Sequence, residues 1–119
     1  MALPVTSPDG ISAMVTWLAT TVDSEESARV LAAAGVHARL AACAQVEAIQ
    51  SYYWWDNALQ TSAEWRITYK TTAGQRPALQ KLLASRHPYK LPQWLWGESA
   101  ASPAYAAWVA GEVTAPLQV

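Results

Sequence analysis

Residues 51–72 read SYYWWDNALQTSAEWRITYKTT, and this stretch decides the fold. Its second half alternates with period two, which is the pattern of a strand with one buried face. Trp65, Ile67 and Tyr69 share the apolar face. The polar face carries Glu64, Arg66, Thr68, Lys70 and Thr72. We therefore predict a strand that packs its large side chains against a core and keeps the polar row outside.

The first half of the stretch predicts the hairpin partner of that strand. Asp56 and Asn57 readily adopt positive φ angles, which a tight two-residue turn requires. Residues 40–55, up to this turn, are mostly apolar or aromatic and predict a long strand. The aromatic run at 52–55 sends consecutive side chains to opposite faces of the strand. Bulk on both faces implies that both faces are covered.

The residues N-terminal to the hairpin predict a strand and a helix. The strand covers residues 11–20, and the helix begins within residues 21–26, with Asp23 or Ser24 as its N-cap. The apolar face of this helix carries Ala28, Leu31, Ala32 and Gly35. Gly35 is either a member of that face or the residue that ends the helix in a left-handed conformation.

The residues C-terminal to the hairpin predict a helix, a short strand and a final helix. The first helix covers residues 75–86. Its inner stripe carries Leu79, Leu82, Leu83 and Arg86. The strand follows at 93–97, and Ser102 caps the final helix at 103–112. The final helix packs Tyr105, Trp108 and Val109.

The order of these elements predicts the fold class. A βαββαβ unit folds as a ferredoxin-like sandwich, so we predict an α+β fold with an antiparallel sheet, both helices on one face and an additional C-terminal helix. The other face keeps large aromatic side chains, and another subunit is the simplest cover for it. Residues 11–113 form a single domain, with flexible tails at 1–10 and 114–119.

Composition excludes several functional classes. The 119 residues are 52% hydrophobic and 14% charged, against about 25% charged in an ordinary soluble domain, and they include 7 tryptophans. So much apolar surface favours self-association. A formal net charge of -1 and the lack of basic runs argue against nucleic acid and membrane partners. Cys43 is the only cysteine, and residues 1–10 do not resemble a secretion signal, so we expect a reducing, cytoplasmic location.

Several short strings, taken in their order and spacing, resemble the CutA family (CutA1, the divalent-cation tolerance proteins). The strings are Thr20-Thr21-Val22, Arg39-Leu40-Ala41-Ala42-Cys43, Ser51-Tyr52-Tyr53-Trp54-Trp55, Tyr69-Lys70-Thr71-Thr72, His87-Pro88-Tyr89 and Ser102-Pro103-Ala104-Tyr105-Ala106-Ala107-Trp108. The resemblance implies a ferredoxin-like subunit in a compact homotrimer, similar in architecture to the PII signalling proteins. It also implies a part in tolerance of copper and other divalent cations. No catalytic Ser/His/Asp set or phosphate-binding glycine loop stands out, so we expect a binding protein and not an enzyme.

The chain departs from the family pattern in three places. Ala44 and Gln45 follow the cysteine, where the family commonly has a hydrophobic residue and asparagine. Asp56-Asn57 stands where an acidic residue and glycine are usual, a change that the turn geometry accepts. Lys90 follows His87-Pro88-Tyr89, where the family usually has an acidic residue. This lysine removes a potential oxygen ligand and weakens the case for a hard cation at this loop.

Cys43 and His87 are the candidate metal ligands, because thiolate sulfur and imidazole nitrogen suit a cation such as copper. Each has a structural alternative: Cys43 as a small buried hydrophobic residue, and His87 as a cationic cap at a helix C-terminus. His37 is expected to be exposed in the loop after the first helix. The chain has no CxxC or HxxxH motif, so a tight site needs ligands from more than one subunit. We expect no tightly bound cofactor, and a divalent cation as the bound species.

The resemblance also implies a ligand cleft between subunits. The residues that it gathers are Tyr53, Trp55, Lys70, His87, Tyr89 and Tyr105. One cation, phenolic donors and aromatic walls suit a small anionic or planar ligand, so the alternative function is a PII-like small-molecule sensor or an enzyme that uses this cleft. In the structural alternative, the aromatic residues pack at the interface and Lys70 is solvated or pairs with Glu64 or Glu98. A trimer whose stability is its main property is a third interpretation.

Overall fold

The computed structural model of the chain describes residues 13–114. Its elements follow the predicted order. They are β1 (Ala13–Val22), α1 (Glu25–His37), β2 (Cys43–Trp55), β3 (Ala58–Thr71), α2 (Arg76–Ala84), β4 (Leu95–Ala101) and α3 (Pro103–Glu112). The predicted tail at 1–10 and residues 115–119 lie outside the described residues. Thr114 lies within them, and its N–H donates to the Arg39 carbonyl oxygen over 3.0 Å.

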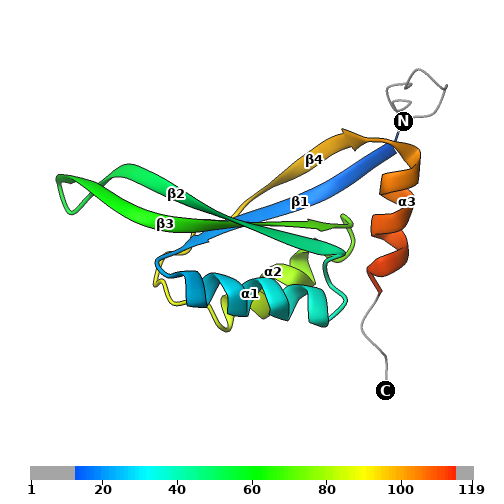
Figure 1. Cartoon of the computed structure of the whole chain (residues 1–119), viewed down its shortest axis with the longest axis horizontal. Coiled ribbons are helices and arrows are strands. Elements are labelled where there is room, and N and C mark those ends of the chain that lie inside the picture. The colour runs from blue at the N-terminus through cyan, green and yellow to red at the C-terminus, as the bar shows by residue number, and fades with distance from the viewer. Residues whose placement is uncertain (1–12, 115–119) are drawn as a thin grey trace.

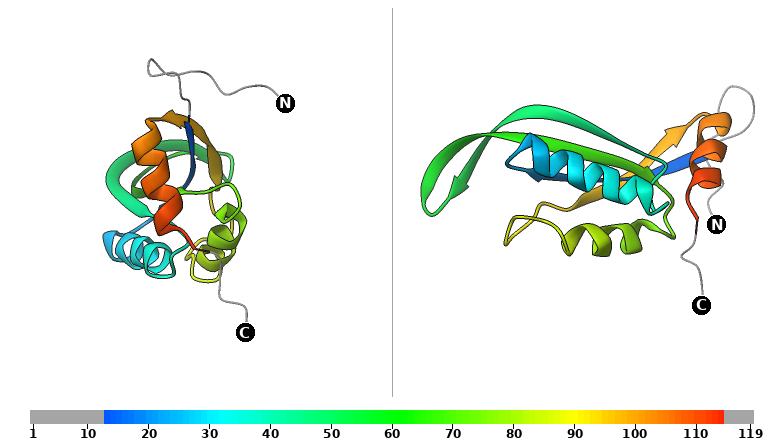
Figure 2. Two further views of the ribbon diagram at one scale, coloured as in Figure 1. Left: turned by 90° about the vertical axis from the view of Figure 1, so that its right-hand side faces the viewer. Right: turned by 60° about the horizontal axis from the view of Figure 1, so that its bottom comes forward.

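The strands form one sheet in the order β2-β3-β1-β4, and every neighbouring pair is antiparallel. α1 and α2 lie side by side on one face of this sheet, whereas α3 stands at the end where β1 begins (Figure 1 and Figure 2). We call the face without α1 and α2 the outer face. The predicted α+β class, the antiparallel sheet and the placement of the first two helices on one face are confirmed.

The β2–β3 hairpin extends beyond the rest of the sheet. Asp56 and Asn57 have φ angles of 54° and 60°, as a type I′ turn requires and as the sequence predicts. β1 pairs with β3 only as far as Val22 opposite Trp65, so the part of β3 before Trp65 has β2 as its only neighbour. Figure 1 shows this two-stranded extension projecting past α1. We call residues 51–64 the aromatic ribbon.

The aromatic ribbon leaves large apolar side chains in solvent. Tyr52 and Trp54 are 71% and 74% exposed, and Trp55 and Leu59 are 57% and 62% exposed. These side chains lie on both faces of the ribbon, as predicted, but the rest of the described chain does not cover them. Large exposed apolar side chains gathered in this way are typical of a contact with another molecule.

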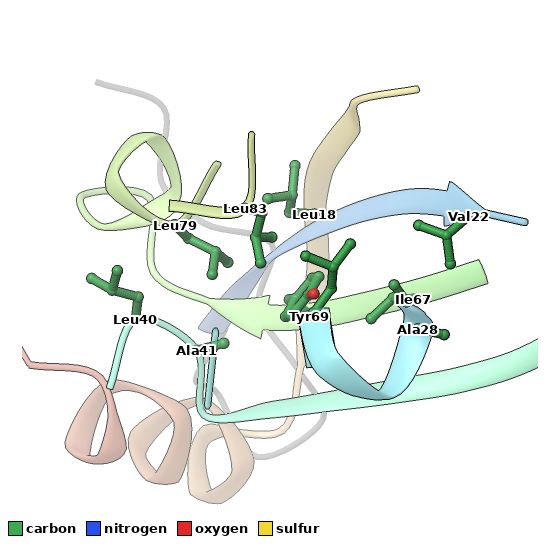
Figure 3. Close-up of a cluster of buried hydrophobic side chains, with 10 residues drawn as sticks. Leu18, Val22, Ala28, Leu40, Ala41, Ile67, Tyr69, Leu79 and Leu83 are labelled. Carbon is green, nitrogen blue, oxygen red and sulfur yellow. The ribbon is translucent and has the colours of Figure 1, made fainter. Parts of the chain in front are cut away.

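The core lies between the sheet and the helices α1 and α2. Ile67 and Tyr69 point into it from β3 and are fully buried, which confirms the predicted apolar face. Figure 3 shows Tyr69 among side chains from β1, α2 and the loop before β2. The other buried members are Leu18, Val22, Ala28, Leu31, Leu40, Ala41, Leu79 and Leu83. Burying one large apolar side chain stabilises a fold by about 1.5–3 kcal/mol, so this cluster supplies the main driving force for folding.

The first helix begins later than predicted. Thr21 and Val22 do not start it but continue β1, because both residues pair with β3. Ser24 is the N-cap, and its Oγ accepts a backbone N–H from the first turn over 3.1 Å. Of the two predicted caps, the structure selects Ser24.

Gly35 lies inside α1 and does not end it. A Cβ atom on Gly35 would stand 2.8 Å from Cε2 of Tyr69 and 2.9 Å from Cδ1 of Leu79, so the glycine lets the helix approach the core closely. The helix continues to His37, and the left-handed residue after it is Arg39, with a φ of 63°. Gly35 is therefore a member of the buried face, which was one of its two interpretations.

Three other predicted boundaries are wrong. β2 begins at Cys43, so residues 40–42 form a loop, whose first two residues are buried. α2 is shorter than predicted, and Arg86 lies exposed beyond its end instead of on its inner stripe. β4 covers Leu95–Ala101 and not 93–97, because β1 offers it pairing partners along that whole length.

α3 has the predicted bounds but buries less than predicted. The Ser102 Oγ accepts the N–H of Tyr105 over 3.3 Å, which confirms the predicted cap. Val109 is buried in a small cluster with Val15 of β1. Tyr105 and Trp108, which were expected to pack as well, are exposed in this chain.

We expect Gly35→Ala to lower the free energy of unfolding by about 1–3 kcal/mol, which is the usual cost of forcing extra volume into a packed core. Gly111→Ala is the matched control, because Gly111 also lies in a helix and a Cβ atom there meets nothing within 4 Å. The control should raise the free energy of unfolding by up to about 1 kcal/mol, since alanine is the better helix former. Urea unfolding at one protein concentration, followed by circular dichroism, measures both. Equal effects would contradict the close approach at Gly35.

Candidate functional site

The outer face of the sheet is hollowed between the aromatic ribbon and the loop that joins α2 to β4. The hollow, which we call the ribbon cleft, has a volume of about 640 Å³. Tyr53, Trp55 and Glu64 line it from the ribbon, and Tyr89 and Lys90 line it from the loop. The structure therefore brings together Tyr53, Trp55 and Tyr89 of the residues predicted to bind a small ligand.

Strand register explains why these side chains meet. Tyr53 pairs with Gln60 and Trp55 pairs with Ala58, which places both aromatic residues on the same face as Glu64. β4 pairs with β1 only as far as Leu95 opposite Ala19, so the end of β1 has no strand on that side. The loop before β4 occupies this edge, and from there its side chains reach both faces of the sheet.

Tyr89 connects the loop to β3 across the outer face. Its hydroxyl donates a hydrogen bond of 2.7 Å to Oε2 of Glu64. Burial raises the pKa of the Tyr89 phenol, and the hydrogen bond to Glu64 and the charge of that carboxylate raise it further. The phenol therefore stays protonated and acts as a donor that holds the Glu64 carboxylate in place.

His87 connects the same loop to the inner side of β1. Its Nε2 lies 2.9 Å from Oγ1 of Thr20, and its Nδ1 accepts the N–H of Tyr89 over 3.1 Å. Because Nδ1 accepts, the neutral ring carries its proton on Nε2, which donates to Thr20. The ring also meets the edge of Trp94, with centroids 5.5 Å apart. Burial lowers the pKa of His87, and the smaller effects of the Thr21 backbone and of the Asp23 charge act in the opposite direction.

The predicted alternative for His87 as a helix cap is wrong. α2 ends at Ala84 with Ser85 as its C-cap, whose N–H donates to helix carbonyl oxygens. His87 lies beyond this cap and is held by β1 and Tyr89 instead. His37, by contrast, is exposed as expected, although it is the last residue of α1 and not part of the loop after it.

Lys70 and Tyr105 lie at the other end of the sheet. They line a separate hollow of about 310 Å³ beside the start of β1. Lys70 donates a hydrogen bond of 2.7 Å to Oε1 of Gln45, so the predicted pairing with Glu64 or Glu98 is wrong. Along β3, Lys70 and Glu64 are about 20 Å apart, at roughly 3.3 Å for each residue of strand. A single chain thus places three of the six predicted ligand-binding residues in the ribbon cleft and two in this second hollow, whereas His87 lines neither.

The two candidate metal ligands are also far apart within one chain. Cys43 is half-buried at the start of β2, with its Sγ 3.7 Å from the hydroxyl of Tyr105. This contact with Cys43 is the main cause that raises the pKa of Tyr105. His87 lies at the opposite end of the sheet, beside the end of β1. Across residues 13–114, no three side chains of the His, Cys, Asp and Glu types lie close enough to hold a metal ion.

Glu64 is the site residue that the sequence did not single out. Its place on the polar face of β3 follows from the period-two pattern. The sequence, however, suggests only one role for it, as a partner of Lys70. Its true partner, Tyr89, comes from a loop whose path depends on where β4 begins. Lys90, noted as a departure from the family pattern, is the second residue of the cleft that carries a charge.

A sequence profile described as CutA1 divalent ion tolerance protein matches residues 16–112. The chain belongs to the CutA1 family. The divalent-cation tolerance protein CutA of Escherichia coli is 38% identical over 76 residues, which are 63% of this chain and 68% of that protein. CutA of Synechococcus elongatus has a solved structure with a TM-score of 0.81 and 42% identity, covering 86% of this chain and 92% of that one. The Escherichia coli relative is named as a divalent-cation tolerance protein.

A second structure of the Synechococcus elongatus CutA is described as a complex with a Bis-Tris molecule. It has a TM-score of 0.77 and 42% identity, and it covers 84% of this chain and 94% of that one. The α+β fold with an antiparallel sheet and three helices is therefore the fold of CutA1 proteins. None of the helices described in this chain is long and apolar enough to cross a membrane.

The half-buried, neutral His87 predicts a dependence of stability on pH. Its pKa is lower in the folded chain than its ordinary value of about 6.5, so the unfolded chain binds a proton first as the pH falls. The contribution of His87 to stability is therefore complete above about pH 6.5 and is lost as the pH falls below that value. We expect His87→Gln to flatten this part of the profile, measured by urea unfolding between pH 7.5 and pH 5. His37→Gln is the control, because that ring is exposed. An unchanged profile in His87→Gln would contradict a neutral, partly desolvated ring.

Proposed function

We propose that this chain forms a homotrimer of ferredoxin-like subunits and takes part in tolerance of divalent cations, copper among them, by binding and not by catalysis. The observation that carries the proposal is an unpartnered aromatic ribbon on a member of the CutA1 family. The strand order and the two helices on one face support the ferredoxin-like assignment. The cytoplasm, where a single thiol stays reduced, is the proposed location.

The exposed surface supports assembly. β2 and β4 are edge strands of the sheet, and unpaired strand edges next to apolar side chains favour contact with another chain. Trp54 lies on the ribbon, whereas Leu95 and Trp96 are exposed on β4, at the opposite edge. When two different surfaces of the chain meet between copies, the interface is head-to-tail. Such an interface closes into a ring when the rotation between neighbouring copies allows it. A closed ring of three chains would remove both edges from solvent.

The metal-binding part of the proposal favours Cys43 over His87. Both ring nitrogens of His87 are engaged, one with Thr20 and one with the Tyr89 N–H, so a metal ion there must displace one of these bonds. Cys43 is only half-buried, and its thiol has one weak contact. Thiolate sulfur prefers soft cations such as Cu(I). Because each chain offers a single thiol, a copper site at Cys43 needs the Cys43 thiols of other subunits as well.

We expect Trp54→Glu to convert the assembly into smaller species, because a charge in an apolar contact is strongly unfavourable. Sedimentation velocity at micromolar concentration measures the change. Val30→Glu is the control, since Val30 is an exposed apolar residue on α1, outside the ribbon and outside β4. A wild-type chain that sediments as a monomer, or an equal loss of assembly in both variants, would overturn the proposed role of the ribbon.

We expect Cys43→Ala to weaken copper binding by roughly tenfold to a hundredfold, which is the range seen even when an outer partner of a metal site is lost. Anaerobic calorimetry with Cu(I), repeated with Cu(II), measures the affinity. His87→Ala should have a smaller effect, and His37→Ala is the control for the exposed imidazole. Identical isotherms for the wild type, Cys43→Ala and His87→Ala would remove both residues from the proposed site.

A second candidate function rests on the ribbon cleft. Its volume of about 640 Å³ falls within the range of small-molecule sites, and aromatic side chains with a few polar groups line it, as is usual for such sites. The Synechococcus elongatus relative that is described with a bound Bis-Tris molecule supports a small-ligand role in this family. We propose that the cleft makes the chain a PII-like sensor of a small molecule, with metal tolerance as the response.

A further inference from the structure

The negative charge in the lining of the ribbon cleft comes from one carboxylate. Glu64 is the only acidic residue in the lining and is half-buried there. Its Oε2 accepts the Tyr89 hydroxyl, which fixes the position of the carboxylate without neutralising it. None of the three ion pairs found in residues 13–114 includes Glu64. A partly desolvated carboxylate without a counter-charge attracts a cation from solution.

The walls around this carboxylate are aromatic. Tyr53 and Trp55 lie on the ribbon side of the cleft, and Tyr89 lies on the loop side. The faces of such rings attract cations, and they attract alkylated ammonium groups more effectively than strongly hydrated ions. A calcium or magnesium ion needs about six oxygen ligands, which one carboxylate cannot supply. An organic cation needs only one opposite charge and apolar contact.

We propose that the ribbon cleft binds a small organic cation, a protonated or quaternary amine, whose charge pairs with Glu64 and whose carbon groups lie against Trp55 and Tyr89. This inference deepens the second candidate function and rests on it. Tyr89 is a positioning residue, because its hydroxyl holds Glu64 while its ring forms the opposite wall.

Lys90 separates this proposal from an anionic ligand. It is the only basic residue in the lining, its side chain is exposed, and it makes no ion pair with Glu64 among the described residues. An anion would face the Glu64 carboxylate with only this exposed lysine as its partner, since Lys70 lies at the other end of the sheet. A cation instead gains the attraction of the Glu64 carboxylate and meets only a screened repulsion from Lys90.

Two matched pairs of probes test the charge. Choline is compared with 3,3-dimethyl-1-butanol, which has the same shape without the charge, and benzylamine is compared with benzyl alcohol. We expect at least one cation to bind the full-length chain about tenfold or more tightly than its neutral counterpart, measured by calorimetry. Glu64→Gln should weaken binding of the cation by a similar factor and leave binding of the neutral probe unchanged. Glu26→Gln, an exposed residue on α1, is the control.

Two further variants keep the test independent of the folding of Glu64→Gln, which circular dichroism checks. Trp55→Leu should weaken binding of the cation by several-fold, because it removes an exposed aromatic face. Lys90→Gln should strengthen binding of the cation, whereas the same change would weaken binding of an anionic ligand. Equal binding of charged and neutral probes would overturn the inference but leave the cleft as a small-molecule site. No binding of any probe would remove both the inference and the sensor function, and it would leave the copper proposal standing.

Discussion

The register between β2 and β3 sets which side chain reaches each face of the sheet. Two residues with positive φ, Asp56 and Asn57, close the turn, and from there every β2 residue has a fixed partner on β3. A slip of one residue would send Ile67 and Tyr69 to solvent and bring the polar row into the core, because side chains alternate along a strand. The same alternation places Glu64 on the outer face with the ribbon aromatics. Core and cleft therefore depend on one set of strand pairings.

The loop after α2 joins these two regions. His87 is bound to β1 on the core side, and two residues later Tyr89 is bound to Glu64 on the outer side. The backbone N–H of Tyr89 is itself donated to His87, so the ring that forms one wall of the cleft is positioned by the histidine. A proton added to Nδ1 would end that bond, and this ties the wall of the cleft to the protonation of a partly buried group. The loop needs no regular secondary structure to be well positioned.

Sequence patterns predicted the features that depend on local chemistry. The period-two strand, the turn residues and the cap at Ser102 are such cases, because alternation, positive φ and an N-cap side chain are properties of neighbouring residues. Features set by distant partners were missed or left open between alternatives. β4 is placed by its pairing with β1, Gly35 by the ring of Tyr69, and Lys70 by Gln45 across the hairpin. Glu64 belongs to this second group, since its partner comes from a loop placed by other elements.

The aromatic ribbon links the two proposed activities physically. Tyr53 and Trp55 line the cleft, whereas Trp54 and Leu59 are exposed outside its lining. A second chain that packs on Trp54 would hold the ribbon more firmly and so position Tyr53 and Trp55 for a ligand. Binding that depends on an ordered ribbon is then tighter in the assembled state, and the ligand in turn stabilises the assembly, because linkage is reciprocal. A shared ribbon would also cover Trp54 and Leu59, which the core of one chain leaves exposed.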